Sequence, residues 1–109
     1  MSDRYNGWAN WETWNCNLWI DNDQGTQEYW AERTQSAWDG IDQDDDDASE
    51  QARKNLADEL EAEHRENAPA VTGFYADIIG CGLSAVDWDE IADSMLGDLD
   101  EQGYKSRAA

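Results

Sequence analysis

Apolar residues recur at helical spacing in five separate stretches of the chain. The first stretch places four of them at positions i, i+3, i+7 and i+8: Trp11, Trp14, Leu18 and Trp19. This spacing gathers side chains on one face of an α-helix, and the preceding Asn10 is a residue type that caps helix N-termini. The pattern therefore predicts a helix over residues 10–22 whose tryptophans contribute to a core, ended by polar turn-forming residues before Gly25.

Four more helices are predicted by the same periodicity, together with residues that favour helix ends. They span residues 27–39, 49–66, 70–84 and 88–101. Thr26, Ser49 and Asp87 are the expected N-caps of the second, third and fifth helices. Glu90 stands three residues after Asp87, so the two can form a capping box at the start of the fifth helix.

The last two helices carry the clearest apolar faces. The fourth has the broadest face in the chain, made by Val71, Phe74, Tyr75, Ile78, Ile79 and Leu83. Gly80 and Gly82 either weaken its last turn or allow another backbone to approach closely. The buried side of the fifth helix is expected to consist of Trp88, Ile91, Ala92, Met95 and Leu99.

These elements predict an all-α fold, a single compact domain of about five helices over residues 1–109, with an acidic surface and with residues 102–109 as a frayed tail. Only residues 70–75 and 83–86 have strand character, which leaves a short hairpin as the minor alternative. Seven tryptophans, four tyrosines and one phenylalanine can bury a modest core in a chain of 109 residues. This aromatic content argues against the disorder that the charge would otherwise suggest.

Charge sets the chain apart from a generic helical domain. Asp and Glu number 26, Lys and Arg number 7, and the net charge is −19. Residues 39–101 hold twenty acids and three bases, whereas residues 1–38 hold six acids and two bases. Such an excess disfavours binding to nucleic acid or to an anionic membrane, and it favours a basic partner.

Two sets of acidic residues are the candidates for binding a partner. The loop before the third helix, with the start of that helix, supplies Asp42, Asp44, Asp45, Asp46, Asp47 and Glu50. The final helix supplies Asp89, Glu90, Asp93, Asp98, Asp100 and Glu101, which lie off its apolar face. Helical residues three or four apart have Cβ atoms about 5–6 Å apart, close to the interval between neighbouring phosphates on one DNA strand. The carboxylates are therefore predicted to imitate DNA before the Lys and Arg of a DNA-binding protein.

Two other interpretations stay open. The acids can form a solvated face, as in a halophilic protein, since the chain has sixteen aspartates and only two lysines. That interpretation predicts an even spread of acids, and the concentration in the second half tells mildly against it. Alternatively, an aromatic patch near Trp8 is the binding surface, because exposed tryptophans often anchor interfaces.

Catalytic and metal chemistry finds little support in the sequence. His64 is the only histidine and stands in a charged helix, where an exposed position is the default. Cys16 and Cys81 fit reduced, buried thiols of a cytoplasmic protein, and no secretion signal or membrane-spanning stretch is evident. Neither Asp-rich segment follows the EF-hand spacing. We therefore expect a non-enzyme without a cofactor or metal, acting in the host-cell cytoplasm.

Two short motifs resemble parts of known families. Residues 5–23 resemble a family of small proteins of phages, plasmids and bacterial genomes, whose N-termini have the form N-G-W-x-N-x-E-T-W-N, and residues 86–92 are similar to its second block. This resemblance implies a mobile-element origin rather than a mechanism. Residues 67–78, followed by an acidic half, are similar to phage anti-restriction proteins that mimic DNA.

The second resemblance implies a function that agrees with the charge. The chain is expected to inhibit a host defence complex, either a CRISPR effector or a restriction enzyme, by occupying its basic DNA-binding surface. An acidic interaction protein of a mobile element or a halophile, with no inhibitory role, is the alternative. The sequence leaves the oligomeric state open.

Overall fold

The computed structural model describes residues 4–106, apart from the side chain of Asp100. In this range the chain folds into five α-helices and one short 3₁₀ helix, and contains no strand, so the all-α prediction is confirmed and the hairpin alternative is wrong. The elements are α1 (Trp11–Asp21), α2 (Gln24–Asp39), α3 (Ala48–Glu66), α4 (Phe74–Ala85), α5 (Trp88–Gly97) and η1 (Asp100–Gln102).

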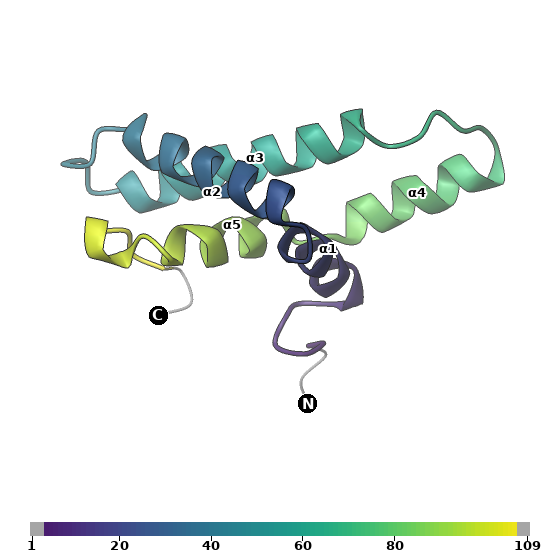
Figure 1. Ribbon diagram of the computed structural model, residues 1–109, viewed down its shortest axis with the longest axis horizontal. Helices are drawn as coiled ribbons and strands as arrows, with labels where there is room; N and C mark the ends of the chain where they lie inside the picture. Colours follow the sequence, from purple (N-terminus) through teal and green to yellow (C-terminus); the bar gives the residue numbers. More distant parts are fainter. Residues whose placement is uncertain (1–3, 107–109) are drawn as a thin grey trace.

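Three helices form the body of the molecule. Figure 1 shows α2, α3 and α5 side by side at one end, with α1 crossing near the middle. The core lies mainly between α3 and α5, where Leu56 and Leu60 meet Ile91 and Leu96. Trp30 and Trp38 of α2 close the core and are almost completely buried.

α4 stands apart from this body. The long helix α3 extends beyond its neighbours, the chain turns through residues 67–73, and α4 runs back beneath α3 towards α1 (Figure 1). α4 begins at Phe74, four residues later than predicted, because Pro69 and Gly73, with φ +66°, hold the preceding segment in a non-helical path. None of its twelve residues is fully buried: Leu83 packs against the core in part, while Phe74, Tyr75 and Ile78 of its broad apolar face are exposed.

The predicted N-caps are correct for α1 and α5 and wrong for α2 and α3. Asn10 and Asp87 accept hydrogen bonds from the backbone N–H groups of Thr13 and Glu90 (2.9 and 3.0 Å). Asp23 rather than Thr26 caps α2: its side chain accepts from the backbone N–H of Thr26 (3.1 Å), and Thr26 lies inside the helix. α3 begins at Ala48, so Ser49 lies inside the helix.

The predicted tryptophan stripe of α1 is also wrong. Trp11 and Trp19 are exposed, and the buried residues of α1 are Thr13 and Ile20. Thr13 faces inward because its hydroxyl accepts a hydrogen bond from the backbone N–H of Asp87 (2.8 Å). This bond fixes the rotation of α1 and turns two tryptophans outward.

The C-terminal segment is tied to the body through Tyr104. α5 ends at Gly97 rather than at residue 101. Tyr104 is buried, and its ring contacts that of Trp38 edge-on at 5.9 Å. The expectation of a frayed tail is therefore wrong for this residue, while residues 107–109 lie outside the described range.

Candidate partner-binding surface

The acid-rich loop between α2 and α3 is ordered by hydrogen bonds of its own. The Asp42 carboxylate accepts from the backbone N–H of Asp44 (3.0 Å), and two turn bonds, Asp45 N–H to Asp42 and Ala48 N–H to Asp45, follow it. Gln51 donates to the carboxylates of both Asp45 and Asp47 (3.3 and 2.6 Å). The loop therefore presents its charges from a defined backbone.

Asp47 is held in its charged form. The hydrogen bond from Gln51, followed by the side-chain interaction with Asp45, lowers the pKa of Asp47 below its usual range. A hydrogen bond donated to a carboxylate stabilises the anion, so this group stays ionised at neutral pH. Gln51 thus holds the carboxylates of Asp45 and Asp47 next to each other.

The structure brings the end of the chain to the same place. The backbone N–H of Lys105 donates to Ser49 (2.8 Å), and the side chains of Gln102 and Gln35 exchange hydrogen bonds (2.8 and 2.9 Å). These contacts set η1 beside the loop. We define the acidic end as the exposed carboxylates at this extremity: Asp39, Asp42, Asp44, Asp45, Asp46, Asp47, Glu50 and Glu101.

Two of the carboxylates predicted on the final helix, Glu90 and Asp93, do not form part of an open acidic face. Asp93 is only 6 % exposed and accepts hydrogen bonds from Tyr104 (2.5 Å) and Ser106 (2.8 Å). The Glu90 side chain is 15 % exposed, binds the backbone N–H of Ala9 (2.8 Å) and forms an ion pair with Arg4. The prediction that these two side chains face solvent is wrong, because each holds a distant segment against α5.

The remaining carboxylates of that helix lie apart from one another. Asp89 forms an ion pair with Arg53 (3.1 Å) and is partly exposed. Asp98 is exposed and lines a shallow depression with Asp21, away from the loop. Glu101 is exposed at the acidic end, and the side chain of Asp100 lies outside the described residues.

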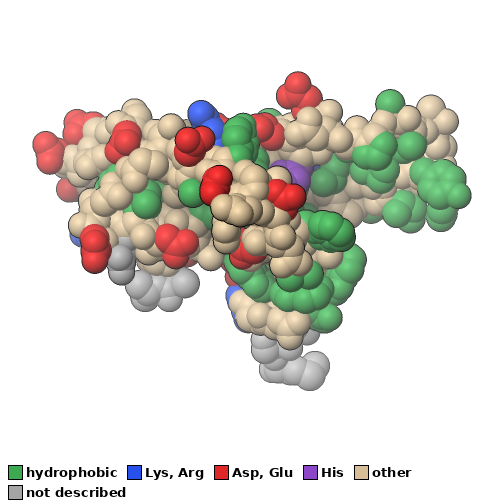
Figure 2. Space-filling view, in the orientation of Figure 1, with side chains coloured by type: hydrophobic (Ala, Val, Ile, Leu, Met, Phe, Trp, Pro, Cys, Tyr) green, Lys and Arg blue, Asp and Glu red, His purple; other side chains and the backbone are tan. Residues whose placement is uncertain are grey.

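Basic side chains do little to offset the acids at this extremity. The four arginines of the described range all form ion pairs within the body, with Glu90, Glu59, Asp89 and Glu61. Lys54 and Lys105 are exposed, and Lys105 lies beside the loop. Figure 2 shows Asp and Glu side chains over the α2, α3 and α5 part of this face and apolar side chains over α4.

The two motif blocks meet in one structural joint. Asn6 and Gly7 both have positive φ and turn the chain so that Tyr5 and Trp8 exchange backbone hydrogen bonds (2.7 and 2.8 Å). The Asn10 side chain donates to the carbonyl of Ala85 (2.6 Å) and accepts from the hydroxyl of Thr13 (2.6 Å). Ala9 also donates its N–H to Glu90, and the Asp87 N–H donates to Thr13, so the N-terminal block is held against the end of α4 and the start of α5; we call this region the joint.

The single histidine has a packing role. The His64 ring stacks on Trp30 at 5.9 Å and lies 5.2 Å from Trp88. Its Nδ1 donates to the carbonyl of Leu60 (2.7 Å), since a carbonyl can only accept. His64 is thus half-buried, not exposed as expected.

The two cysteines lie in different surroundings. Burial raises the pKa of Cys16 to about 11, which keeps this thiol protonated at neutral pH. Cys81, in contrast, is exposed, so the expectation of two buried thiols is wrong for it. Within residues 4–106, no cluster of His, Cys, Asp and Glu has the arrangement of a metal site.

Comparison with known proteins assigns the family. The sequence model of a family of unknown function, DUF7249, matches residues 1–102. The chain belongs to this family. The DUF7249 match includes the joint, the acidic end and α4. Neither the curated proteins nor the solved structures give a match to this chain. None of the helices in the described part combines the length and the apolar character needed to cross a membrane.

Proposed function

We propose that this DUF7249 protein is an inhibitor encoded by a phage or another mobile element, and that its acidic end occupies the DNA-binding surface of a host defence complex. The partner is the basic surface of a CRISPR effector or a restriction enzyme. The observation that carries the proposal is the acidic end itself, an array of eight exposed carboxylates on a hydrogen-bonded loop and the adjoining turn.

The mechanism follows from electrostatics. Lys and Arg side chains that neutralise DNA phosphates attract any fixed array of negative groups of similar density. An ordered loop binds with less entropy loss than a mobile acidic tail, because its charges are already positioned. Glu90 and Asp93 do not take part, since both are held within the body.

A competition assay tests the proposal. Labelled duplex DNA is bound to a candidate effector, and the protein is titrated in while DNA release is followed by gel shift. The wild-type protein is expected to displace the DNA, and the displacement should weaken as salt rises because the contacts are ionic. A variant that carries Lys at Asp44, Asp45, Asp46 and Glu50 should fail to displace it.

A charge-matched variant is the control. Replacing Asp21, Glu28, Glu32 and Asp58 by Lys changes the net charge by the same amount, and all four residues are exposed elsewhere on the body. This variant should still displace DNA. Equal loss in both variants would mean that bulk charge matters and the acidic end does not, which contradicts the proposal.

The alternative function is that of an acidic interaction protein of a mobile element or a halophile. The scarcity of lysine, with two against sixteen aspartates, favours it. A thermal melt with and without molar salt separates the two. Our proposal predicts a cooperative melt in dilute buffer and a modest rise in melting temperature with salt, since salt screens self-repulsion. A chain that folds only in molar salt would favour the halophile.

A further inference from the structure

α4 lacks the packing that a helix of its kind requires. It has twelve residues, includes Gly80 and Gly82, and has no side-chain hydrogen bond at its N-cap. Isolated helices shorter than about 12–15 residues are marginal in water even with favourable sequences, and helices in proteins depend on burying an apolar face. Only part of the apolar face of α4 packs against this chain, since Leu83 is half-buried while Phe74, Tyr75 and Ile78 are exposed, so a further surface is expected to cover the rest.

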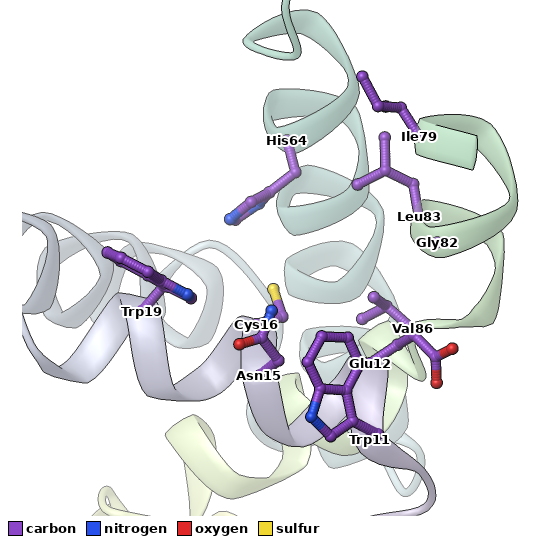
Figure 3. A pocket seen from close by; sticks show the side chains of 10 residues that line it. All are labelled: Trp11, Glu12, Asn15, Cys16, Trp19, His64, Ile79, Gly82, Leu83 and Val86. Carbon is purple, nitrogen blue, oxygen red and sulfur yellow. The ribbon is translucent and has the colours of Figure 1, made fainter. Parts of the chain in front are cut away.

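The side of α4 that faces α1 forms one wall of an apolar groove. The groove has a volume of about 320 Å³ and is lined by α1, α3 and α4. Figure 3 shows Trp11, Cys16 and Trp19 of α1 across from Ile79 and Leu83 of α4, with His64 between them. Phe74, Tyr75 and Ile78 continue the apolar surface towards the free end of α4.

The exposed apolar area is large enough for a stable interface. Trp19 and Phe74 are 70 % exposed, Tyr75 is 68 % exposed and Trp11 is 49 % exposed. At 150–250 Å² for each aromatic side chain, these four residues alone leave about 400–600 Å² of surface uncovered. A standard protein interface buries about 800 Å² on each partner, and Ile78, Val71 and the groove walls add to the total.

The near-absence of charge on this surface favours a second copy of the chain over a basic partner. Residues 67–86 contain a single acid, Asp77, and no base, although the whole chain carries −19. A strongly basic partner gains nothing from such a neutral face, and would meet the acids of the body instead. A second copy of this chain can dock there, because the contact keeps both acidic ends at the far side of each molecule.

We propose that the protein forms a two-fold dimer in which α4 of each copy lies in the groove between α1 and α4 of the other. A two-fold interface uses the same patch on both copies, and this patch contains both parts it needs, a protruding apolar helix and a groove. Phe74, Tyr75 and Ile78 of one copy then cover Trp11 and Trp19 of its partner. The dimer does not depend on the proposed function.

Light scattering during size-exclusion chromatography tests the dimer. The wild-type protein is expected to have twice the mass of one chain at micromolar concentration. Phe74→Glu and Trp19→Glu place a carboxylate on opposite walls of the contact, so each should raise the dissociation constant at least about a hundredfold. Both residues are mostly exposed in the single chain, so circular dichroism should show that the body of each variant stays helical.

Ser84→Glu is the matched control. Ser84 lies on the same helix, is exposed, and accepts a hydrogen bond from Arg65 (3.3 Å) on the side away from the apolar face. This variant should remain a dimer. Added salt should strengthen the dimer, because it screens the repulsion between two acidic chains. A wild-type protein with the mass of one chain at every concentration, or helical Phe74→Glu and Trp19→Glu variants that both remain dimers, would overturn the inference.

Discussion

In the joint between the N-terminus and α5, the sequence predicts some contacts of single residues and misses others. Asn10 and Asp87 are recognisable as caps because their partners lie three residues away. Glu90 and Asp93 look like solvent-facing acids, yet Glu90 binds Ala9, 81 residues away, and Asp93 binds Tyr104, which lies beyond the end of α5. Local spacing does not reveal such partners, so the sequence wrongly predicts that the side chains of Glu90 and Asp93 face solvent.

Thr13 is the residue of the joint whose loss should matter most. Its hydroxyl is completely buried, accepts from the backbone N–H of Asp87 (2.8 Å) and donates to Asn10. Thr13→Val keeps the shape but leaves the Asp87 N–H without its acceptor, which should lower the free energy of unfolding by about 1–3 kcal/mol. Urea denaturation measures the change. Thr72→Val, at an exposed position, is the control and should be neutral; equal effects would contradict this role.

Cysteine labelling gives a second prediction at this scale. The raised pKa of Cys16, about 11 against 9.0 for a free thiol, lowers its thiolate fraction at neutral pH roughly a hundredfold. A thiol reagent should therefore modify the exposed Cys81 first, and mass spectrometry after digestion identifies the site. In a Cys81→Ser variant, labelling of Cys16 should accelerate as pH rises towards 11.

Because folding favours the protonated thiol, Cys16 stabilises the fold below pH 9 and this contribution is lost as the pH passes 11. Rapid labelling of Cys16 at neutral pH would show that the thiol is not buried.

At the scale of elements, periodicity predicts which segments are helical but not which face is covered. The periodicity predicts all five helices. The faces of α1 and α4 were misjudged for one shared reason. A hydrogen bond from Asp87 sets the rotation of α1, and the chain covers α4 only in part, leaving Phe74, Tyr75 and Ile78 exposed. An apolar stripe indicates that a helix packs, while its partner depends on the rest of the fold and, in our inference, on a second copy.

Replacement by alanine should change the stability of α4 in opposite directions at Gly73, which precedes the helix, and at Gly80, which lies inside it. Gly80 lies inside the helix with open space around it, so Gly80→Ala should stabilise α4 by about 0.5–1 kcal/mol. Gly73 has φ +66°, so Gly73→Ala should destabilise it by about 1–2 kcal/mol. Hydrogen exchange of the α4 amides is the readout. A loss of protection in Gly80→Ala would contradict this description of the helix.

Across the whole molecule, charge and apolar surface are separated. The exposed carboxylates of the acidic end lie where α2, α3 and η1 meet, and the apolar surface lies on α4 and the adjoining side of α1 (Figure 2). The sequence predicted the acidic loop because four consecutive aspartates can hardly be buried. It did not indicate that η1 would bring Glu101 to the same extremity. That placement depends on the burial of Tyr104, which the polar residues around it in the sequence do not predict.

The footprint of a bound effector on this protein tests the central claim most directly. Hydrogen exchange of the protein is compared with and without a DNA-binding effector that it inhibits. The account predicts added protection over residues 39–50 and around Glu101, with the groove between α1 and α4 unchanged. Protection confined to α1 and α4, with the acidic end exchanging as in the free protein, would contradict the claim that these carboxylates take the place of DNA.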